Sequence, residues 1–159
     1  MVVISDTTTI TNLIQVDLLY TLPQLYKKIL IPGAVYDELA RFEDHKQFLD
    51  LSEWIEVVEV TDSDELKRLM SVLDRGEAEA IILSLELDAD YLIIDEMKGR
   101  KLAKQYRIPI IGLLGILILS KKQGIITQVK TPLEKLRSEI GFRISEELFH
   151  HVLNEVDEE

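Results

Sequence analysis

Short, continuously apolar runs constrain the fold of this chain more than any other feature. They are VVIS (2–5), ILI (29–31), YLII (91–94) and a run at 108–111. Between them, apolar residues recur three or four positions apart, which is typical of amphipathic helices. Strands that are apolar on both faces and alternate with helices form parallel sheets that are covered on both sides. The sequence therefore predicts an α/β fold with a central parallel sheet.

The same patterns give approximate element boundaries. We predict helices near residues 9–19, 22–28, 35–42, 45–51, 62–72, 77–87, 98–106, 113–122, 132–140 and 145–154, and one further strand near 54–60. Asp62, with Glu65 three residues later, is expected to open its helix as a relative of the capping box. The acidic end, EVDEE, is expected to be frayed.

Length and composition are those of one ordinary globular domain, which we expect to span residues 1–159. Apolar residues make up 47% and there is no cysteine, so disulfides and thiolate metal sites are excluded. The start of the chain does not resemble a signal peptide. The longest apolar stretch, 108–119, is too short to cross a bilayer. We therefore expect a cytoplasmic protein with no membrane partner.

The charge balance disfavours attraction of nucleic acid by the protein as a whole. Lysine and arginine number 18 against 29 aspartates and glutamates, which gives a net charge of −11. One basic cluster runs against this trend and contains Lys98, Arg100, Lys101, Lys104 and Arg107. It is either a solvated helix face or a local contact for nucleic acid.

Acidic residues stand where a parallel sheet places its functional groups. Asp6 directly follows the first strand, and Asp95 directly follows YLII. Glu38 lies on the helix after ILI, and Glu77 opens the helix that leads to YLII. The crevice beyond the carboxyl ends of the strands is where such sheets bind ligands. Asp6 alone has a simpler interpretation as the N-cap of the next helix, and the two roles are compatible.

Several carboxylates in one crevice repel one another unless cations are present. Mg²⁺ and Mn²⁺ prefer carboxylate oxygens and water, and they need neither cysteine nor histidine. Such an ion polarises a phosphoryl oxygen and activates a bound water. We therefore expect Mg²⁺ or Mn²⁺ as the cofactor.

Glu77 and Glu79 compete for one of these positions. Two residues apart on a helix is a rotation of about 200°, so the two side chains face opposite ways. Glu77 shares its stripe with the small residues Ala80 and Ser84, whereas Glu79 shares its stripe with Glu86, which suggests solvent. We favour Glu77 and keep Glu79 as the alternative.

Four blocks of the chain together resemble the PIN domain, and more narrowly the prokaryotic subgroup close to toxin–antitoxin nucleases. The blocks are VISDTTTITNL, ILIPGAVYDEL, LDRGEAEAIILSLELDADYLIIDE and GRKLAKQYRIPIIGLLGIL. They occur in the family's order and spacing and cover roughly residues 1 to 125. We expect residues 125–159 to form a helical C-terminal extension. The resemblance implies a three-layer α/β/α sandwich and a metal-dependent ribonuclease.

By this resemblance, the family's acidic positions fall on Asp6, Glu38, Glu77 and Asp95, which would be both the catalytic residues and the metal ligands. Glu96 is the alternative to Asp95, because acidic residues often occupy both places. Thr7 and Asn12 match polar positions of the first block. Arg100, one turn beyond Asp95, would hold a phosphate or stabilise the carboxylates when metal is absent.

Three functions follow as hypotheses. The first is a metal-dependent endoribonuclease, the toxin of a toxin–antitoxin pair, which acts on RNA and is silenced by a small antitoxin. The second is a regulatory or binding module that keeps the fold and cleaves little or no RNA. The third is a phosphatase with Asp6 as nucleophile, but that chemistry usually has a second Asp two residues later, where Thr8 stands. We also expect a homodimer, as the resemblance implies.

Overall fold

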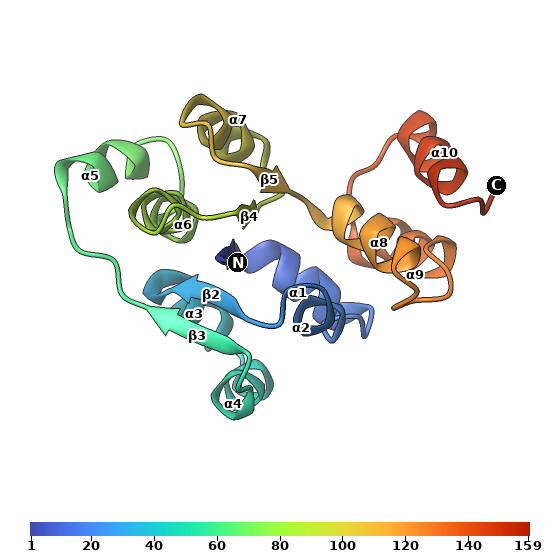
Figure 1. Cartoon of the computed structure of the whole chain (residues 1–159), viewed down its shortest axis with the longest axis horizontal. Helices are drawn as coiled ribbons and strands as arrows, with labels where there is room; N and C mark the ends of the chain where they lie inside the picture. Colours follow the sequence, from blue (N-terminus) through green and yellow to red (C-terminus); the bar gives the residue numbers. More distant parts are fainter.

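The fold is built around a five-stranded parallel sheet (Figure 1). The computed structural model describes residues 1–159. The strands are β1 (Val3–Ser5), β2 (Ile29–Pro32), β3 (Ile55–Val58), β4 (Tyr91–Ile93) and β5 (Ile110–Ile111). The helices are α1 (Thr7–Gln15), α2 (Thr21–Tyr26), α3 (Gly33–Leu39), α4 (Glu43–Leu51), α5 (Asp64–Met70), α6 (Arg75–Glu86), α7 (Met97–Gln105), α8 (Leu113–Lys122), α9 (Lys130–Lys135), the π-helix η1 (Leu136–Ile140) and α10 (Glu146–Glu155).

The strand order is β3-β2-β1-β4-β5, and every neighbouring pair is parallel. In register, Ile4 pairs with Leu30 on one side and with Leu92 on the other. Along the chain, β2 and β3 are therefore added on one side of β1, and β4 and β5 are added on its other side. Such a change of side leaves a crevice at the carboxyl ends of the two central strands.

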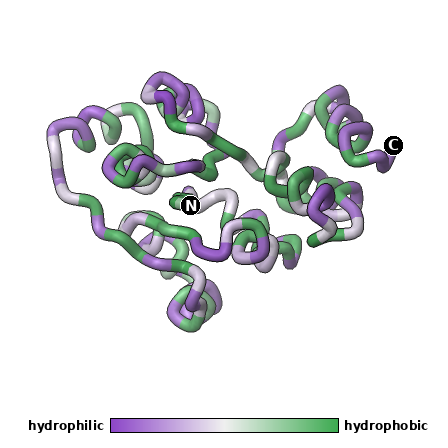
Figure 2. Tube along the Cα trace, in the orientation of Figure 1, coloured by the Kyte–Doolittle hydropathy of each residue, from purple (hydrophilic) through white to green (hydrophobic).

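Two hydrophobic cores cover the two faces of the sheet. Val3 and Ile93 face the larger core, which α1, α2, α8 and the C-terminal helices complete. Ile4 and Leu92 face the smaller core, which lies under α5, α6 and α7. Figure 2 shows the apolar central strands between helices whose outer faces are hydrophilic, most plainly α7 and α10. The predicted α/β fold, a parallel sheet in a three-layer sandwich, is confirmed. No helix has the length and apolarity that would let it cross a membrane.

Several predicted boundaries differ from the structure for identifiable reasons. The first helix begins at Thr7 rather than Thr9 because Asp6 is its N-cap, and it ends at Gln15, shortly before Asp17 adopts a left-handed conformation. The cap of α5 is Ser63 rather than the predicted Asp62: the Ser63 hydroxyl accepts a hydrogen bond from the Leu66 amide at 3.1 Å. Serine is as good an N-cap as aspartate, so the sequence did not distinguish them.

The acidic end of the chain is anchored rather than frayed at Glu158. Its carboxylate accepts hydrogen bonds from the Val129 and Lys130 amides at 2.7 and 3.0 Å, and the Lys121 ammonium lies 3.0 Å away. Burial alone would raise the pKa of Glu158, but these donors hold it below its usual value. The carboxylate thereby joins α8 and the start of α9 to the end of α10.

We predict that Glu158→Ala lowers the free energy of unfolding by about 1–3 kcal/mol, because it leaves two amides and an ammonium without their partner. In a domain of this size each kcal/mol corresponds to about 2–4 °C in Tm. Thermal unfolding measures the effect, with Glu147→Ala, an exposed glutamate of α10, as the control. Equal losses in both variants would contradict the anchoring role.

Candidate functional site

The core of the candidate site is a pair of carboxylates at the ends of β1 and β4. The Asp6 amide donates to the carbonyl of Ile93 at 2.9 Å, which continues the pairing of the two strands. In return, the Asp95 amide donates to Asp6 Oδ2 at 3.2 Å. Backbone pairing therefore places the two side chains beside each other. Asp6 is only 2% exposed.

Asp6 is the N-cap of α1 and also lies against Asp95. Its Oδ1 accepts a hydrogen bond from the Thr9 amide at 3.0 Å and so caps α1, while Oδ2 faces Asp95. Burial, and then the charge of Asp95, raise the pKa of Asp6 to about 7. Asn12 lies one turn beyond Thr9 on the same helix and is largely buried.

The Asp95 side chain accepts hydrogen bonds from residues of two helices, α1 and α8. The Thr9 hydroxyl donates to its Oδ2 at 2.8 Å, and the Leu113 amide, at the N-terminus of α8, donates at 3.0 and 3.2 Å. A helix N-terminus stabilises negative charge. The contact of Thr9 with Asp95 was not predicted from the sequence, although its place one turn after Asp6 was a signal that it shares that face of α1. Arg100 does not pair with Asp95; its Nη1 donates to the Ile94 carbonyl at 2.8 Å.

A second group of carboxylates lies where α6 and α7 begin. Asp74 caps α6 by accepting from the Glu77 amide at 2.8 Å, and Glu96 caps α7 by accepting from the Gly99 amide at 2.8 Å. The Glu77 side chain lies beside both. Burial, followed by the neighbouring Asp74 and Glu96 carboxylates, raises the pKa of Glu77 to about 9. Asp74 was also missed, although an acid three residues before Glu77 has the spacing of a helix cap.

Glu38, on α3, lies close to Asp74 and so to the same group of carboxylates. Burial, and then the charge of Asp74, raise the pKa of Glu38. The Glu38 carboxylate also lies beside the Thr7 hydroxyl, which is enclosed and has no hydrogen-bond partner of good geometry. Asp74 is thus the acid that both Glu38 and Glu77 face.

Three glycines make room for these carboxylates. A Cβ at Gly76 would come within 2.3 Å of Glu38 Oε1, one at Gly99 within 3.0 Å of Glu77 Oε2, and one at Gly112 within 2.5 Å of Asp95 Oδ1. Gly76 and Gly99 lie in the first turns of α6 and α7, and Gly112 is the N-cap of α8. The carboxylates therefore approach helix N-termini more closely than any other residue type would allow.

The prediction that Glu79 faces solvent is wrong. Glu79 is not turned to solvent: it is 4% exposed, accepts from the Ala34 amide at 3.1 Å and pairs with Arg75 at 2.7 Å. The stripe that Glu79 shares with Glu86 did not indicate solvent exposure at Glu79, because α6 is covered nearly all round. Both oxygens of Glu79 are thus occupied, whereas Glu77 Oε2 is buried with no partner.

These residues fit a hard divalent cation. The donors are carboxylates and hydroxyls, and two buried oxygen atoms, Thr7 Oγ1 and Glu77 Oε2, have no partner. No three acidic or histidine side chains converge closely enough to hold an ion by themselves. Mg²⁺ does not require this, because it usually binds one or two carboxylates and keeps several waters. The Asp6–Asp95 pair meets that requirement.

Comparison with known families agrees with this geometry. A family model described as a PIN domain matches residues 2–158. The chain belongs to the PIN-domain family, whose members are generally nucleases that use divalent metal ions. The match continues past residue 125, so it includes the C-terminal helices that the sequence resemblance did not cover. A search among curated proteins gave no match.

The raised pKa of Asp6 predicts how stability depends on pH when no metal is present. Between about pH 4 and 7 the folded protein binds more protons than the unfolded chain, so stability falls as pH rises through this window. A pKa that is one unit higher in the folded protein corresponds to about 1.4 kcal/mol, so the shift of Asp6 amounts to about 3 kcal/mol over this range. We therefore expect Tm in EDTA to drop by about 6–13 °C from pH 4.5 to pH 8. The pKa values of Glu38 and Glu77 are also raised, so both residues add to the fall of stability with rising pH.

Thermal unfolding across this pH range checks the prediction, with Asp6→Asn as the matched variant. The amide side chain cannot ionise, so the slope should be smaller in the variant. A Tm that is constant or rises with pH in the wild-type protein would contradict the assignment.

Proposed function

We propose that this protein is a divalent-metal-dependent endoribonuclease that hydrolyses RNA phosphodiester bonds. The observation that carries the proposal is the Asp6–Asp95 pair, which adjacent strand ends hold together in a chain of a nuclease family. Two neighbouring carboxylates, of which Asp6 is buried and Asp95 half-buried, are costly to ionise together unless a cation compensates them. The acidic crevice can accept a phosphodiester only with such compensation, and this suits a metal-dependent reaction.

Each residue has a role within this proposal. Asp6 and Asp95 would hold Mg²⁺ or Mn²⁺, which when bound activates water and stabilises the charge that develops on the phosphate. Glu77 offers its unpartnered oxygen, and Glu38 lies beside the unpartnered Thr7 hydroxyl, so both can orient water by hydrogen bonding. Thr9 and the Leu113 amide fix the orientation of Asp95. Glu96 caps α7 and faces Glu77, which places it at the rim.

The biological setting is a further part of the proposal. By its resemblance to toxin–antitoxin nucleases, the protein would act on RNA in the cytoplasm and be inhibited by a small antitoxin. The antitoxin and the homodimer stay predictions. Of the apolar residues of α8, three are buried and three are partly buried against the larger core: Leu113, Ile116 and Leu117, and Leu114, Ile118 and Leu119, respectively.

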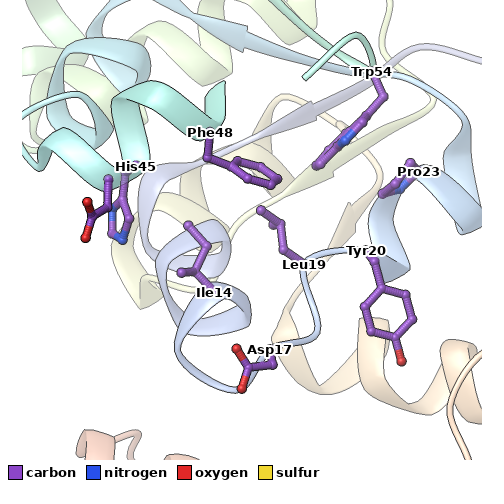
Figure 3. A pocket seen from close by; sticks show the side chains of 9 residues that line it. Ile14, Asp17, Leu19, Tyr20, Pro23, His45, Phe48 and Trp54 are labelled. Carbon is purple, nitrogen blue, oxygen red and sulfur yellow. The ribbon is translucent and has the colours of Figure 1, made fainter. Parts of the chain in front are cut away.

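One observation favours the second candidate, a regulatory or binding module. A hollow of about 510 Å³ lies away from the carboxylates, between the end of α1, the start of α2 and α4 (Figure 3). Tyr20, Phe48 and Trp54 contribute its aromatic lining, with Tyr20 46% and Phe48 42% exposed. Asp17 and Asp44 also line it, so this surface suits a protein segment with apolar and basic side chains rather than RNA.

The test is cleavage of a labelled single-stranded RNA with added Mn²⁺ or Mg²⁺. Asp6→Asn keeps the size of the side chain and the cap of α1, because asparagine caps helices as well as aspartate does. We expect cleavage to fall at least about 100-fold in this variant, since it loses one ligand charge.

The matched control is Asp17→Asn, which makes the same change at an exposed residue in a left-handed conformation that asparagine tolerates. It should cleave like the wild type. Equal cleavage by wild type and Asp6→Asn would contradict the proposed site. Absence of metal-dependent cleavage in the wild type across several RNAs would favour the binding module.

A further inference from the structure

A polar hollow continues from the carboxylate site toward α3. It measures about 410 Å³ and is lined by Ala34, Asp37, Glu38, Arg41, Asp74 and Arg75. Glu38 and Asp74 belong to both the hollow and the site, so the two spaces are contiguous. A polymer whose reacting bond lies at the carboxylates would extend into this hollow on one side.

Arg41 is the cation of this hollow that forms no ion pair. It follows α3, is exposed, and forms no ion pair within 4 Å with any carboxylate. Its guanidinium lies near enough to Glu38 to lower the pKa of that carboxyl, in opposition to burial and Asp74. All of its N–H donors are therefore available to a ligand.

Arg75 lies in the same hollow but is fixed in place. Its Nε donates to Glu79 Oε2 at 2.7 Å, and its Nη2 reaches Asp62 Oδ1 at 3.5 Å. A guanidinium has five donors, so these contacts leave others that can face the hollow. Arg75 is thus a second donor, held by Glu79 and Asp62, beside the exposed Arg41.

The opposite flank of the site also carries basic groups. Lys98 lies at the start of α7 near Glu96, and Arg100 is anchored at the end of β4. Cations thus border the acidic site on two sides. This arrangement suits a chain of phosphates that crosses the carboxylates, with one phosphate on each side of the reacting one.

We propose that Arg41, assisted by Arg75, binds the phosphate next to the scissile one and positions single-stranded RNA across the carboxylates. The hollow has no aromatic side chain on which a base could stack, and Ala34 is its one apolar residue. The contact is therefore to the sugar–phosphate backbone and independent of base sequence. This inference rests on the proposed function, because it assumes that the carboxylates are where RNA reacts.

The experiment measures binding and cleavage separately. Binding of a fluorescent single-stranded RNA is followed by anisotropy with Ca²⁺, and cleavage with Mn²⁺, for the wild type and Arg41→Gln. The matched control is Arg143→Gln, which removes one charge from an exposed residue on the distant loop before α10. Both variants have the same net charge, so any difference reports position rather than the overall field.

We expect Arg41→Gln to weaken RNA binding about 5- to 10-fold and to raise KM more than it lowers kcat. The slope of log Kd against log salt should fall by about 0.7, the value for one lost phosphate contact on a single strand. Arg41→Lys should restore part of the affinity, and Arg143→Gln should change it less than twofold.

The two proposals can fail independently. Arg41-dependent binding without metal-dependent cleavage would overturn the nuclease proposal and keep the RNA contact. Cleavage that requires Asp6 but is indifferent to Arg41 would overturn the RNA contact and keep the nuclease. Equal weakening by Arg41→Gln and Arg143→Gln, or no RNA binding by the wild type, would also overturn the role of Arg41.

Discussion

The structure of the candidate site depends on the pairing of β1 with β4. This pairing places the ends of two parallel strands side by side, and both strands continue into an aspartate. The hydrogen bond from the Asp95 amide to the Asp6 carboxylate is the direct consequence. Two like charges at this distance repel each other. The burial of strands that are apolar on both faces therefore supplies the stabilisation that holds the two aspartates together.

The remaining elements reduce the cost of this charge. Asp6, Asp74 and Glu96 each cap a helix, and Asp95 accepts from the first amide of another. Each carboxylate thus faces backbone N–H groups at a helix N-terminus, where negative charge is favourable. Glycines at the helix starts allow the close approach. The compensation is partial, because the pKa values of Asp6 and Glu77 still lie well above the ordinary range.

Much of this arrangement could be predicted from the sequence. Apolar runs gave the parallel sheet, and their ends gave Asp6 and Asp95, because strand direction alone fixes the edge at which they meet. The roles of Thr9 and Asp74 could not be found in this way. They depend on side-chain hydrogen bonds between elements, and pattern analysis finds such bonds only where a cap spacing is noticed.

The choice between Glu77 and Glu79 shows a related limit of helical patterns. Rotation about the helix axis separated the two residues correctly, but it could not say which side was covered. Glu79 is buried because α3 and Arg75 lie against it, and that contact comes from tertiary packing. Burial of a charged residue depends on its partner, and the partner is distant in the sequence.

The most direct test of the central claim is a crystal structure of the protein grown with Mn²⁺, with anomalous scattering used to locate the ion. The account predicts an anomalous peak in contact with the Asp6 and Asp95 carboxylates at the ends of β1 and β4, and no peak there in Asp6→Asn. A wild-type crystal with Mn²⁺ bound elsewhere, or with no ion between these two side chains, would contradict it.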